Sequence, residues 1–525
     1  MFLRTLIVPD RYLDSVLLMG LAARLRGLAG VADASAVMGT EANRALLAET
    51  GLLDETATAA APGDVIVSLQ LAEPTQLPAA QAALEAMLAE LTRTDAGSGG
   101  GAGDAATPPR TLEEALRQRP DASVAVISLP GGYVAREARR ALELGLHPFI
   151  FSDNVPLADE VALKALGRER GLLVMGPDCG TAILNGLALG FANRVARGPV
   201  GIIGASGTGI QELSCLLHRQ GIGIHQAIGV GGRDLSAAVG GSSMLQALAI
   251  LEADPACLVI VLVSKPPHPE VAQAVLDRAA ACAKPCVICF LGGDPGQAAQ
   301  RNLPFARRLD LAAAMTRAVL AGEDPLTVAD APLPPARQAQ ATTLAADLGA
   351  GRRFVRGLFS GGTLGKEALL VLRESLPTYR TNLEEEGPRA LVGDDRPTDH
   401  LILDLGDDRY TRGRPHPMID FGLRCQRLQQ ELADPSCAVL LLDVVLGYGA
   451  HPDPAGELAT AVAGRLQPGG PVLLACVVGT ENDPQPRPDQ VRRLTAAGFQ
   501  VLDTNVEAAR MAAAILVELQ RRNQP

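Results

Sequence analysis

The stretch LEADPAC at residues 251–257, followed by the apolar run 258–263, decides the fold of this chain. It returns as ELADPSC at residues 431–437, followed by the apolar run 438–442. A continuous apolar run of this length, placed after a helical pattern, is typical of a buried strand in a parallel sheet. The chain therefore carries one βα unit twice, and we expect two similar domains with one site between them.

A glycine-rich turn lies upstream of each copy, ASGTG at residues 205–209 and SGGTL at residues 360–364. Each turn joins a predicted strand to a predicted helix, where unpaired N–H groups attract an oxyanion. The turns are too short for a Walker loop, and either one alone is also explained as a tight connection. Because the motif occurs twice at equivalent places, we predict that both turns bind phosphate or carboxylate. The predicted binding residues are Ser206, Gly207, Thr208, Gly209, Gly361, Gly362 and Thr363.

An insertion distinguishes the second copy from the first. The copies are offset by 180 residues at the Asp-Pro element but by 155 at the glycine turn, so the second copy holds 25 extra residues. This region includes GDDRYTRGRPHP at residues 406–417, which follows a predicted strand. Three Arg and a His at the carboxyl end of a strand favour a site for carboxylate or phosphate, although a solvated loop explains them too. We assign catalysis to Arg412, Arg414 and His416, and substrate binding to Arg409.

A second glycine cluster, GVGGRD at residues 229–234, also follows a predicted strand. A strand-end turn and a helix cap are its simple structural explanations. Arg233 among so many glycines is nevertheless a candidate anion clamp, and Gly231, Gly232 and Arg233 complete the predicted binding set. The loop GPDCGT at residues 176–181 occupies a similar position, but alone it is equally well explained as a tight turn.

Composition limits the class of protein. A chain of 525 residues with a net charge of -11 is long enough for three or four domains and too acidic for a nucleic-acid surface. No apolar run reaches membrane-spanning length and the first residues lack a signal-peptide core, so we expect a cytoplasmic protein without membrane or nucleic-acid partners. Cys286 and Cys289 lie on a predicted strand, where they point to opposite faces, so no metal site is predicted.

Strand and helix patterns divide the chain into four units. The first predicts a small α+β domain of the ferredoxin-like kind, and the others predict parallel, doubly wound sheets covered by helices. In the second unit the apolar stretch 172–175 predicts a strand. Segments rich in Gly, Ser, Pro or Ala predict linkers between some of them. The predicted boundaries are 1–92 for the small domain, 93–109 for a flexible linker, 110–197 for the second unit, 198–330 for the first copy, 331–350 for another linker and 351–525 for the second copy.

Several motifs, in order, resemble the α subunit of succinyl-CoA synthetase and related acyl-CoA ligases. They are GPDCGT at 176–181, GPVGIIGASGTGIQEL at 198–213, IGVGGRDL at 228–235 and DPACLVIVLV at 254–263. With DDRYTRGRPHPMID at 407–420, the chain is similar to the FdrA family over nearly its whole length. The resemblance implies a truncated CoA-binding-like Rossmann domain at 110–197 and two flavodoxin-like, ligase-CoA-like domains. It also implies that two helices, beginning at Gly209 and Leu364, point at one phosphate from opposite sides.

Two departures from the synthetases affect the expected activity. Those enzymes phosphorylate a His in a glycine-rich loop, but the corresponding loops here, GGDPGQAAQRNLP at 292–304 and GTENDPQPRPD at 479–489, contain no His. The unit at 110–197 also lacks the first strand and glycine loop that would hold the CoA nucleotide. CoA is therefore a candidate cofactor without a complete predicted site, and no other cofactor is implied.

The resemblance to FdrA implies a component of oxamate carbamoyltransferase in allantoin and purine breakdown. Such an enzyme interconverts oxalurate plus phosphate with oxamate plus carbamoyl phosphate. In this hypothesis the helix starts bind the phosphate while an arginine of the inserted loop binds the carboxylate, and other subunits of a hetero-oligomeric complex are the expected partners. Two alternatives stay open, an ADP-forming acyl-CoA ligase and a noncatalytic assembly subunit.

Overall fold

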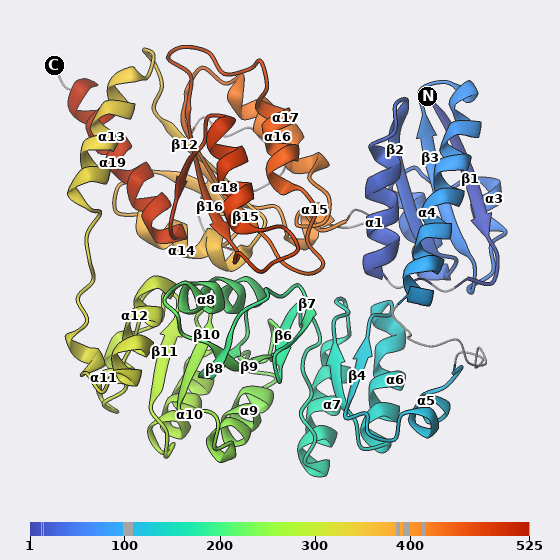
Figure 1. Ribbon diagram of the computed structural model, residues 1–525, viewed down its shortest axis with the longest axis horizontal. Coiled ribbons are helices and arrows are strands. Elements are labelled where there is room, and N and C mark those ends of the chain that lie inside the picture. Colours follow the sequence, from blue (N-terminus) through green and yellow to red (C-terminus); the bar gives the residue numbers. More distant parts are fainter. Residues whose placement is uncertain are drawn as a thin grey trace.

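Four α/β units make up the protein in the computed structural model, which describes residues 1–11, 13, 15–97, 109–384, 389–391, 399–411 and 415–523 (Figure 1). The two copies of the repeated unit lie against each other (Figure 1). The predicted multidomain α/β architecture with a small α+β unit at its front is confirmed. Within the described ranges, no helix combines the length and apolar character that a membrane crossing requires.

The N-terminal unit is a sheet covered by helices on both faces. Its elements are β1 (Phe2–Val8), α1 (Ser15–Arg26), β2 (Val31–Met38), α2 (Glu41–Glu49), α3 (Glu55–Thr58), β3 (Val65–Leu71) and α4 (Leu77–Gly97). The strands are antiparallel in the order β1-β3-β2. Val65 and Val67 pack under α1 and α4, whereas Ile66 faces α2, as the alternation of a strand requires. Because α4 continues to Gly97, a helix occupies the start of the predicted linker 93–109, and residues 98–108 lie outside the described residues.

The second unit is a fragment of an α/β domain. It contains α5 (Leu112–Gln118), β4 (Val124–Ile127), α6 (Gly131–Glu143), β5 (His147–Ile150) and α7 (Leu157–Arg170), with β4 and β5 parallel. A third strand was expected at 172–175, but only Met175 forms a bridge, to Phe149. The segment is apolar because Val174 packs in the core of this unit while Leu173 and Met175 pack against the next unit. Burial, rather than strand pairing, therefore explains its sequence.

The first copy is built on a six-stranded sheet in the order β11-β10-β8-β9-β6-β7. Its strands are β6 (Thr181–Leu184), β7 (Leu187–Gly190), β8 (Arg197–Gly204), β9 (Ile224–Gly229), β10 (Val259–Ser264) and β11 (Cys286–Phe290). Its helices are α8 (Gly207–Arg219), α9 (Ser242–Ala253), α10 (Pro269–Ala280), α11 (Pro295–Ala299) and α12 (Leu309–Leu320). Cys286 packs under α9 and α10 and Cys289 under α8 and α12, which confirms their opposite directions.

The hairpin β6–β7 is a finding that the sequence analysis missed. Its turn is Asn185-Gly186, with φ of 51° and 81°. Two left-handed residues in a two-residue loop match the right-handed twist of a hairpin, and Asn-Gly is the preferred pair there. The hairpin pairs with β9 through Ile183, so it belongs to the first copy, whose sheet begins near residue 181 rather than at 198.

The second copy has an all-parallel sheet in the order β13-β14-β12-β15-β16-β17. Its strands are β12 (Phe354–Phe359), β13 (Tyr379–Thr381), β14 (His400–Asp404), β15 (Cys437–Val445), β16 (Val472–Val478) and β17 (Gln500–Leu502). Its helices are α14 (Gly362–Leu372), α15 (Asp408–Thr411), α16 (Gly422–Leu432), α17 (Pro454–Val462), α18 (Arg487–Ala496) and α19 (Asn505–Asn523). The order β14-β12-β15-β16 repeats β9-β8-β10-β11, which is the flavodoxin-like order.

Register confirms the duplication residue by residue. Gly201 of β8 lies opposite Ile260 of β10, and Arg356 of β12 lies opposite Leu440 of β15. These pairs preserve the offsets of 155 and 180 residues seen in the sequence. The insertion between the landmarks supplies edge strand β13.

One hydrophobic core joins the two copies. Leu213 of α8 and Leu369 of α14 belong to the same cluster of buried side chains, which extends to α12 and α19. Figure 1 shows α8 and α14 at the boundary between the copies. The copies therefore pack as one body through the faces of their first helices.

The segment 331–350 was expected to be a linker, but it contains α13 (Pro335–Asp347). Ala341 and Ala345, one helical turn apart, are fully buried in the core shared with α19 (Figure 1). Alanine is the strongest helix former, and its small side chain allows close packing of two helices. The composition that suggested a linker is thus that of a closely packed helix.

Candidate functional site

The two glycine turns meet at the boundary between the copies. Ser206 caps α8 by accepting a hydrogen bond from the Gly209 N–H at 2.9 Å. The hydroxyls of Ser206 and Thr363 lie 2.6 Å apart, which joins the start of α8 to the start of α14. The helices begin at Gly207 and Gly362. They therefore start two residues earlier than the predicted Gly209 and Leu364. We call the residues 206–209 and 361–363 the glycine-turn junction.

Close approach explains two of the glycines at this junction. A Cβ on Gly361 would lie 2.7 Å from Cγ2 of Thr208. A Cβ on Gly362 would lie 2.2 Å from a carboxyl oxygen of Asp404. Neither position could hold a larger residue without moving its neighbours. Gly361 thus allows the copies to meet, whereas Gly362 leaves room for Asp404 of its own copy, in addition to any contact with a ligand.

Lys265 brings an uncommitted positive charge to the junction. It follows β10 directly, and its Nζ lies 3.4 Å from the place where a Gly362 Cβ would be. Its side chain is exposed and makes no hydrogen bond or ion pair with any residue in the described part of the chain. An ammonium group beside a helix start adds to the positive potential of the unpaired N–H groups. The junction can therefore bind an anion from two directions.

Two carboxyl groups surround this positive charge. Burial raises the pKa of Asp404 to about 6, and Lys265 opposes that rise. Crowding by protein also raises the pKa of Asp178, with repulsion from nearby carboxylates, although its exposed carboxyl keeps contact with water, which limits the shift. Asp178 lies on the loop GPDCGT with a φ of 56°. Loops from three units therefore place titratable groups around Lys265.

Arg233 has partners that the sequence did not reveal. Its Nη2 lies 2.9 Å from a carboxyl oxygen of buried Glu160 and donates to the carbonyl of Val155 at 2.8 Å. Lys164 Nζ donates to Glu160 at 2.9 Å and to Asp234 at 2.8 Å, all three being nearly inaccessible. The predicted clamp therefore fastens the second unit to the first copy, while the Arg233 side chain stays 41% exposed.

The backbone of the same cluster is packed against the second unit. Gly231 has a φ of 87°, and a Cβ there would lie 2.2 Å from the carbonyl oxygen of Pro177. A Cβ on Gly232 would lie 3.2 Å from Asp178. Both predicted binding glycines therefore serve a close contact between units, next to the carboxyl of Asp178.

The inserted loop is described in part. The predicted catalytic residues Arg412 and Arg414 lie outside the described residues. Arg409 lies on α15, is exposed and donates to the Leu391 carbonyl at 3.1 Å. His416 is half-buried, with its Nδ1 accepting from the Met418 N–H at 3.2 Å. Burial lowers the pKa of His416 to about 4, so the imidazole is neutral near pH 7.

His416 lies at the same strand end as Asp404. A Cβ on Gly406 would lie 2.6 Å from Nε2 of His416 and 3.2 Å from a carboxyl oxygen of Asp404. Sequence reasoning found His416 but missed both Asp404 and Lys265. The signal was available, because each is at or directly after the carboxyl end of a parallel strand, where ligands bind.

One of the two loops that lack the phosphorylated His, 479–489, makes contacts between the copies. Asp483 accepts from the Asn193 side chain at 2.8 Å and from the Arg194 N–H at 2.7 Å. The Thr480 hydroxyl donates to the Arg194 carbonyl at 2.8 Å. The loop 479–485 is thus tied to the segment that follows β7.

The chain is similar to a known protein over nearly its whole length. The protein YahF of Escherichia coli (strain K12) is 40% identical over 521 residues, which cover 98% of each chain. The chain belongs to the YahF family. Models for a CoA-ligase and for a CoA-binding domain match residues 358–515 and 196–292 of this YahF-family chain. The CoA-binding match falls on the first copy and shares only residues 196–197 with 110–197, where a CoA-binding-like domain was predicted.

More distant relatives share the ligase-like part. The α subunit 2 of an ADP-forming succinate–CoA ligase from Archaeoglobus fulgidus is 27% identical over 159 residues, 30% of this chain and 54% of that protein. The α subunit of malate–CoA ligase from Methylorubrum extorquens is 28% identical over 191 residues, 35% of this chain and 62% of its own length. A solved dinucleotide-forming acetyl-coenzyme A synthetase 1 of Ca. Korarchaeum cryptofilum covers 77% of this chain and 85% of its own at 16% identity, with a TM-score of 0.29. About a third of the chain is thus similar to the α subunits of CoA ligases, in the part that the CoA-ligase and CoA-binding models also match.

A model described as AllF, heavy metal-associated domain, matches residues 1–106. The first His of the chain is His147 and the first Cys is Cys179, so residues 1–106 contain neither. Soft metal ions require thiolate or imidazole ligands. Among the described residues, no group of three or more His, Cys, Asp or Glu could hold a metal ion. The match therefore gives the fold of this unit without its metal chemistry.

Proposed function

We propose that the glycine-turn junction binds phosphate and that the chain takes part in carbamoyl transfer between carbamoyl phosphate and oxamate. The observation that carries the proposal is Lys265, an exposed ammonium without a partner in the described part of the chain, beside the start of α14. Helix N–H groups and an ammonium together are a suitable receptor for a phosphate dianion. The absence of His from 292–304 and 479–489 favours a transfer without a phosphorylated enzyme.

The reaction can be written for these residues. A phosphate oxygen attacks the carbamoyl carbon of oxalurate, the bond from that carbon to the oxamate nitrogen breaks, and the nitrogen takes a proton. Lys265 would hold the phosphate and stabilise charge as it shifts. Asp404, whose pKa burial raises to about 6, carries a proton on part of its population near neutral pH. Resemblance to FdrA supplies the substrates, the link to purine breakdown and the expectation of further subunits.

The test uses the purified full chain, alone and together with the products of its neighbouring genes. Carbamoyl phosphate and oxamate are added, and released phosphate and oxalurate are measured. Lys265→Ala should reduce kcat/KM at least tenfold, the typical value of a charge-assisted contact, and Lys265→Arg should recover part of it. If no product forms under either condition, carbamoyl transfer is refuted.

The inserted loop is tested separately. Arg412→Ala and Arg414→Ala should raise the KM for oxamate if their guanidinium groups bind its carboxylate. Arg492→Ala is the control, because Arg492 is exposed and its ion pair is with Asp489. Unchanged KM values in both loop variants would remove these residues from the site.

An ADP-forming acyl-CoA ligase is the second candidate. The CoA-ligase and CoA-binding matches, which together cover both copies, support it. In this activity ATP is converted to ADP, and a carboxylic acid is joined to CoA as a thioester. Formation of a thioester by the chain without carbamoyl transfer would replace the first proposal by this one.

A further inference from the structure

A pocket in the second copy lies at the opposite end of its sheet from the glycine turn. It has a volume of about 390 Å³ and is lined by Arg353, Phe354, Arg356, Arg427, Gln430, Glu431, Ala433, Asp434, Pro435 and Ser436. Phe354 begins β12, whereas Gly361 follows the end of that strand. The pocket is therefore separate from the glycine-turn junction.

The duplication shows that the fold does not require this pocket. By the offsets established from register, Arg356, Arg427 and Glu431 correspond to Gly201, Ala247 and Leu251 of the first copy. There, a Cβ on Gly201 would lie 2.7 Å from both Leu251 Cδ1 and Cys257 Sγ, so the equivalent space is filled. The second copy has replaced this apolar contact with charged residues around an open volume.

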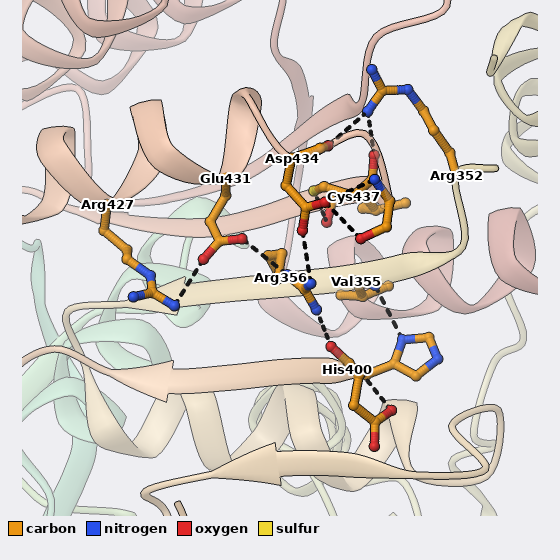
Figure 2. A network of polar contacts seen from close by, with 11 residues as sticks. Arg352, Val355, Arg356, His400, Arg427, Glu431, Asp434 and Cys437 are labelled. Atoms are coloured by element: carbon orange, nitrogen blue, oxygen red, sulfur yellow. Dashed lines mark hydrogen bonds and ion pairs between the residues drawn. The ribbon is translucent and has the colours of Figure 1, made fainter. Parts of the chain in front are cut away.

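The acidic groups of the pocket are already neutralised by protein donors. Glu431 accepts from Arg356 Nε at 2.9 Å and lies 2.8 Å from Arg427 Nη2 (Figure 2). Asp434 accepts from Arg356 Nη2 at 2.9 Å and from the Ser436 hydroxyl at 2.7 Å. Both oxygens of each carboxylate are thereby used. The pocket is consequently unsuited to a cation.

The uncommitted groups of the pocket are hydrogen-bond donors. Arg353 is exposed, and its side chain makes no hydrogen bond or ion pair with the described residues. Its guanidinium lies 4.9 Å from the centre of the Phe354 ring. The Nε of Arg427 is buried without a hydrogen-bond partner. Three Arg against two acids leave the lining with one excess positive charge. Charge and donors together favour an anion.

We propose that this pocket binds a small organic anion with phosphate or carboxylate oxygens, at a site distinct from the glycine-turn junction. Arg353 contacts the anion at the mouth, Phe354 holds that guanidinium by a cation–π contact, and Arg356 keeps the two carboxylates away from the ligand. The cluster of Glu431, Asp434 and Arg356 is thus the support of the site, and Arg353 and Arg427 are its binding groups.

The test measures anion binding by calorimetry on the full chain carrying Lys265→Ala, so that the junction does not contribute. Inorganic phosphate and malonate are the two probes, at constant ionic strength, and they distinguish phosphate from carboxylate recognition. Arg353→Ala in this background should weaken binding about tenfold or more, the value of a charge-assisted hydrogen bond, and Arg353→Lys should weaken it less. Arg492→Ala should leave binding unchanged.

A second variant guards against a trivial loss of structure. Arg427→Gln leaves Glu431 its bond to Arg356, so the fold is expected to survive, as circular dichroism would confirm, and binding should again weaken. The proposal is overturned if neither probe binds the Lys265→Ala chain at concentrations well above millimolar. It is equally overturned if Arg353→Ala and Arg427→Gln bind as tightly as their background. Because Lys265 is absent throughout, these outcomes are independent of the proposed transfer activity.

Discussion

Replacing Lys164 with Met should destabilise the contact between the second unit and the first copy by about 3 kcal/mol, since removal of one partner from a buried ion pair costs about 3–5 kcal/mol. The ammonium donates at 2.9 Å to Glu160, at 2.8 Å to Asp234 and at 3.0 Å to the Val230 carbonyl. The lower end of the range applies because Asp234 keeps two backbone N–H donors, from Ser243 and Met244. Glu160 also keeps Arg233.

Urea unfolding followed by far-ultraviolet circular dichroism measures this effect, since the chain has no Trp to report by fluorescence. Lys284→Met is the matched control. Lys284 donates to the carbonyls of Leu251 and Asp254 and to no carboxylate, so its loss should cost only about 1–2 kcal/mol. The first unfolding transition of the Lys164→Met chain should occur at a lower urea concentration than that of the Lys284→Met chain. Equal midpoints for the two variants would refute the reasoning that an uncompensated buried charge dominates the cost.

Three further predictions concern the copies and their hairpin. Burial raises the pKa of Glu367 to about 8, so the folded state holds this proton more tightly than the unfolded state. Stability, measured as Tm, should therefore fall as pH rises from 5 to 8. The Glu367→Gln variant should show a smaller fall in Tm over this range. An equal slope in both proteins would contradict this. Gly361→Ala should lower Tm and weaken the contact between the copies, because its Cβ would collide with Thr208. Limited proteolysis of the variant should then be faster. An unchanged proteolysis rate would show that the junction adapts to the added Cβ. Gly186→Ala should cost about 1–2 kcal/mol in urea unfolding because of its φ of 81°, whereas Gly63→Ala, in open space, should cost little; equal costs would exclude the left-handed turn as the cause.

The sequence predicted the sheets well because their strands are buried on both faces. Ile202 packs under α8 and Ile203 under α9, so β8 is a continuous apolar run in the sequence. The same periodicity misled at residues 172–175, where burial in two cores produced an apolar run without a paired strand. A hydrophobic pattern indicates that a segment is buried, and strand pairing is a further inference from that burial.

The candidate site was predicted only where local chemistry marks it. Ser206 and Thr363 were found because a glycine turn before a helix is a local signal. Lys265 directly follows a predicted strand, which was a usable signal, but its place beside Gly362 of the other copy, nearly a hundred residues away in the chain, is not visible in the sequence. The ion pair of Arg233 is likewise not visible in the sequence, since its partner Glu160 lies on a helix of the second unit, and its role in anion binding stays a prediction. Contacts between units are not predictable from the local sequence.

Because the two copies share one core and one chain, their assembly does not depend on protein concentration. If the copies were separate subunits, their association would depend on protein concentration and would weaken on dilution. Joined in one chain, they meet at an effective concentration in the millimolar range, set by the connecting segment. Each half is then supplied in equal amount and is always assembled. The arginine pocket lies at the other end of the second half's sheet from the glycine-turn junction.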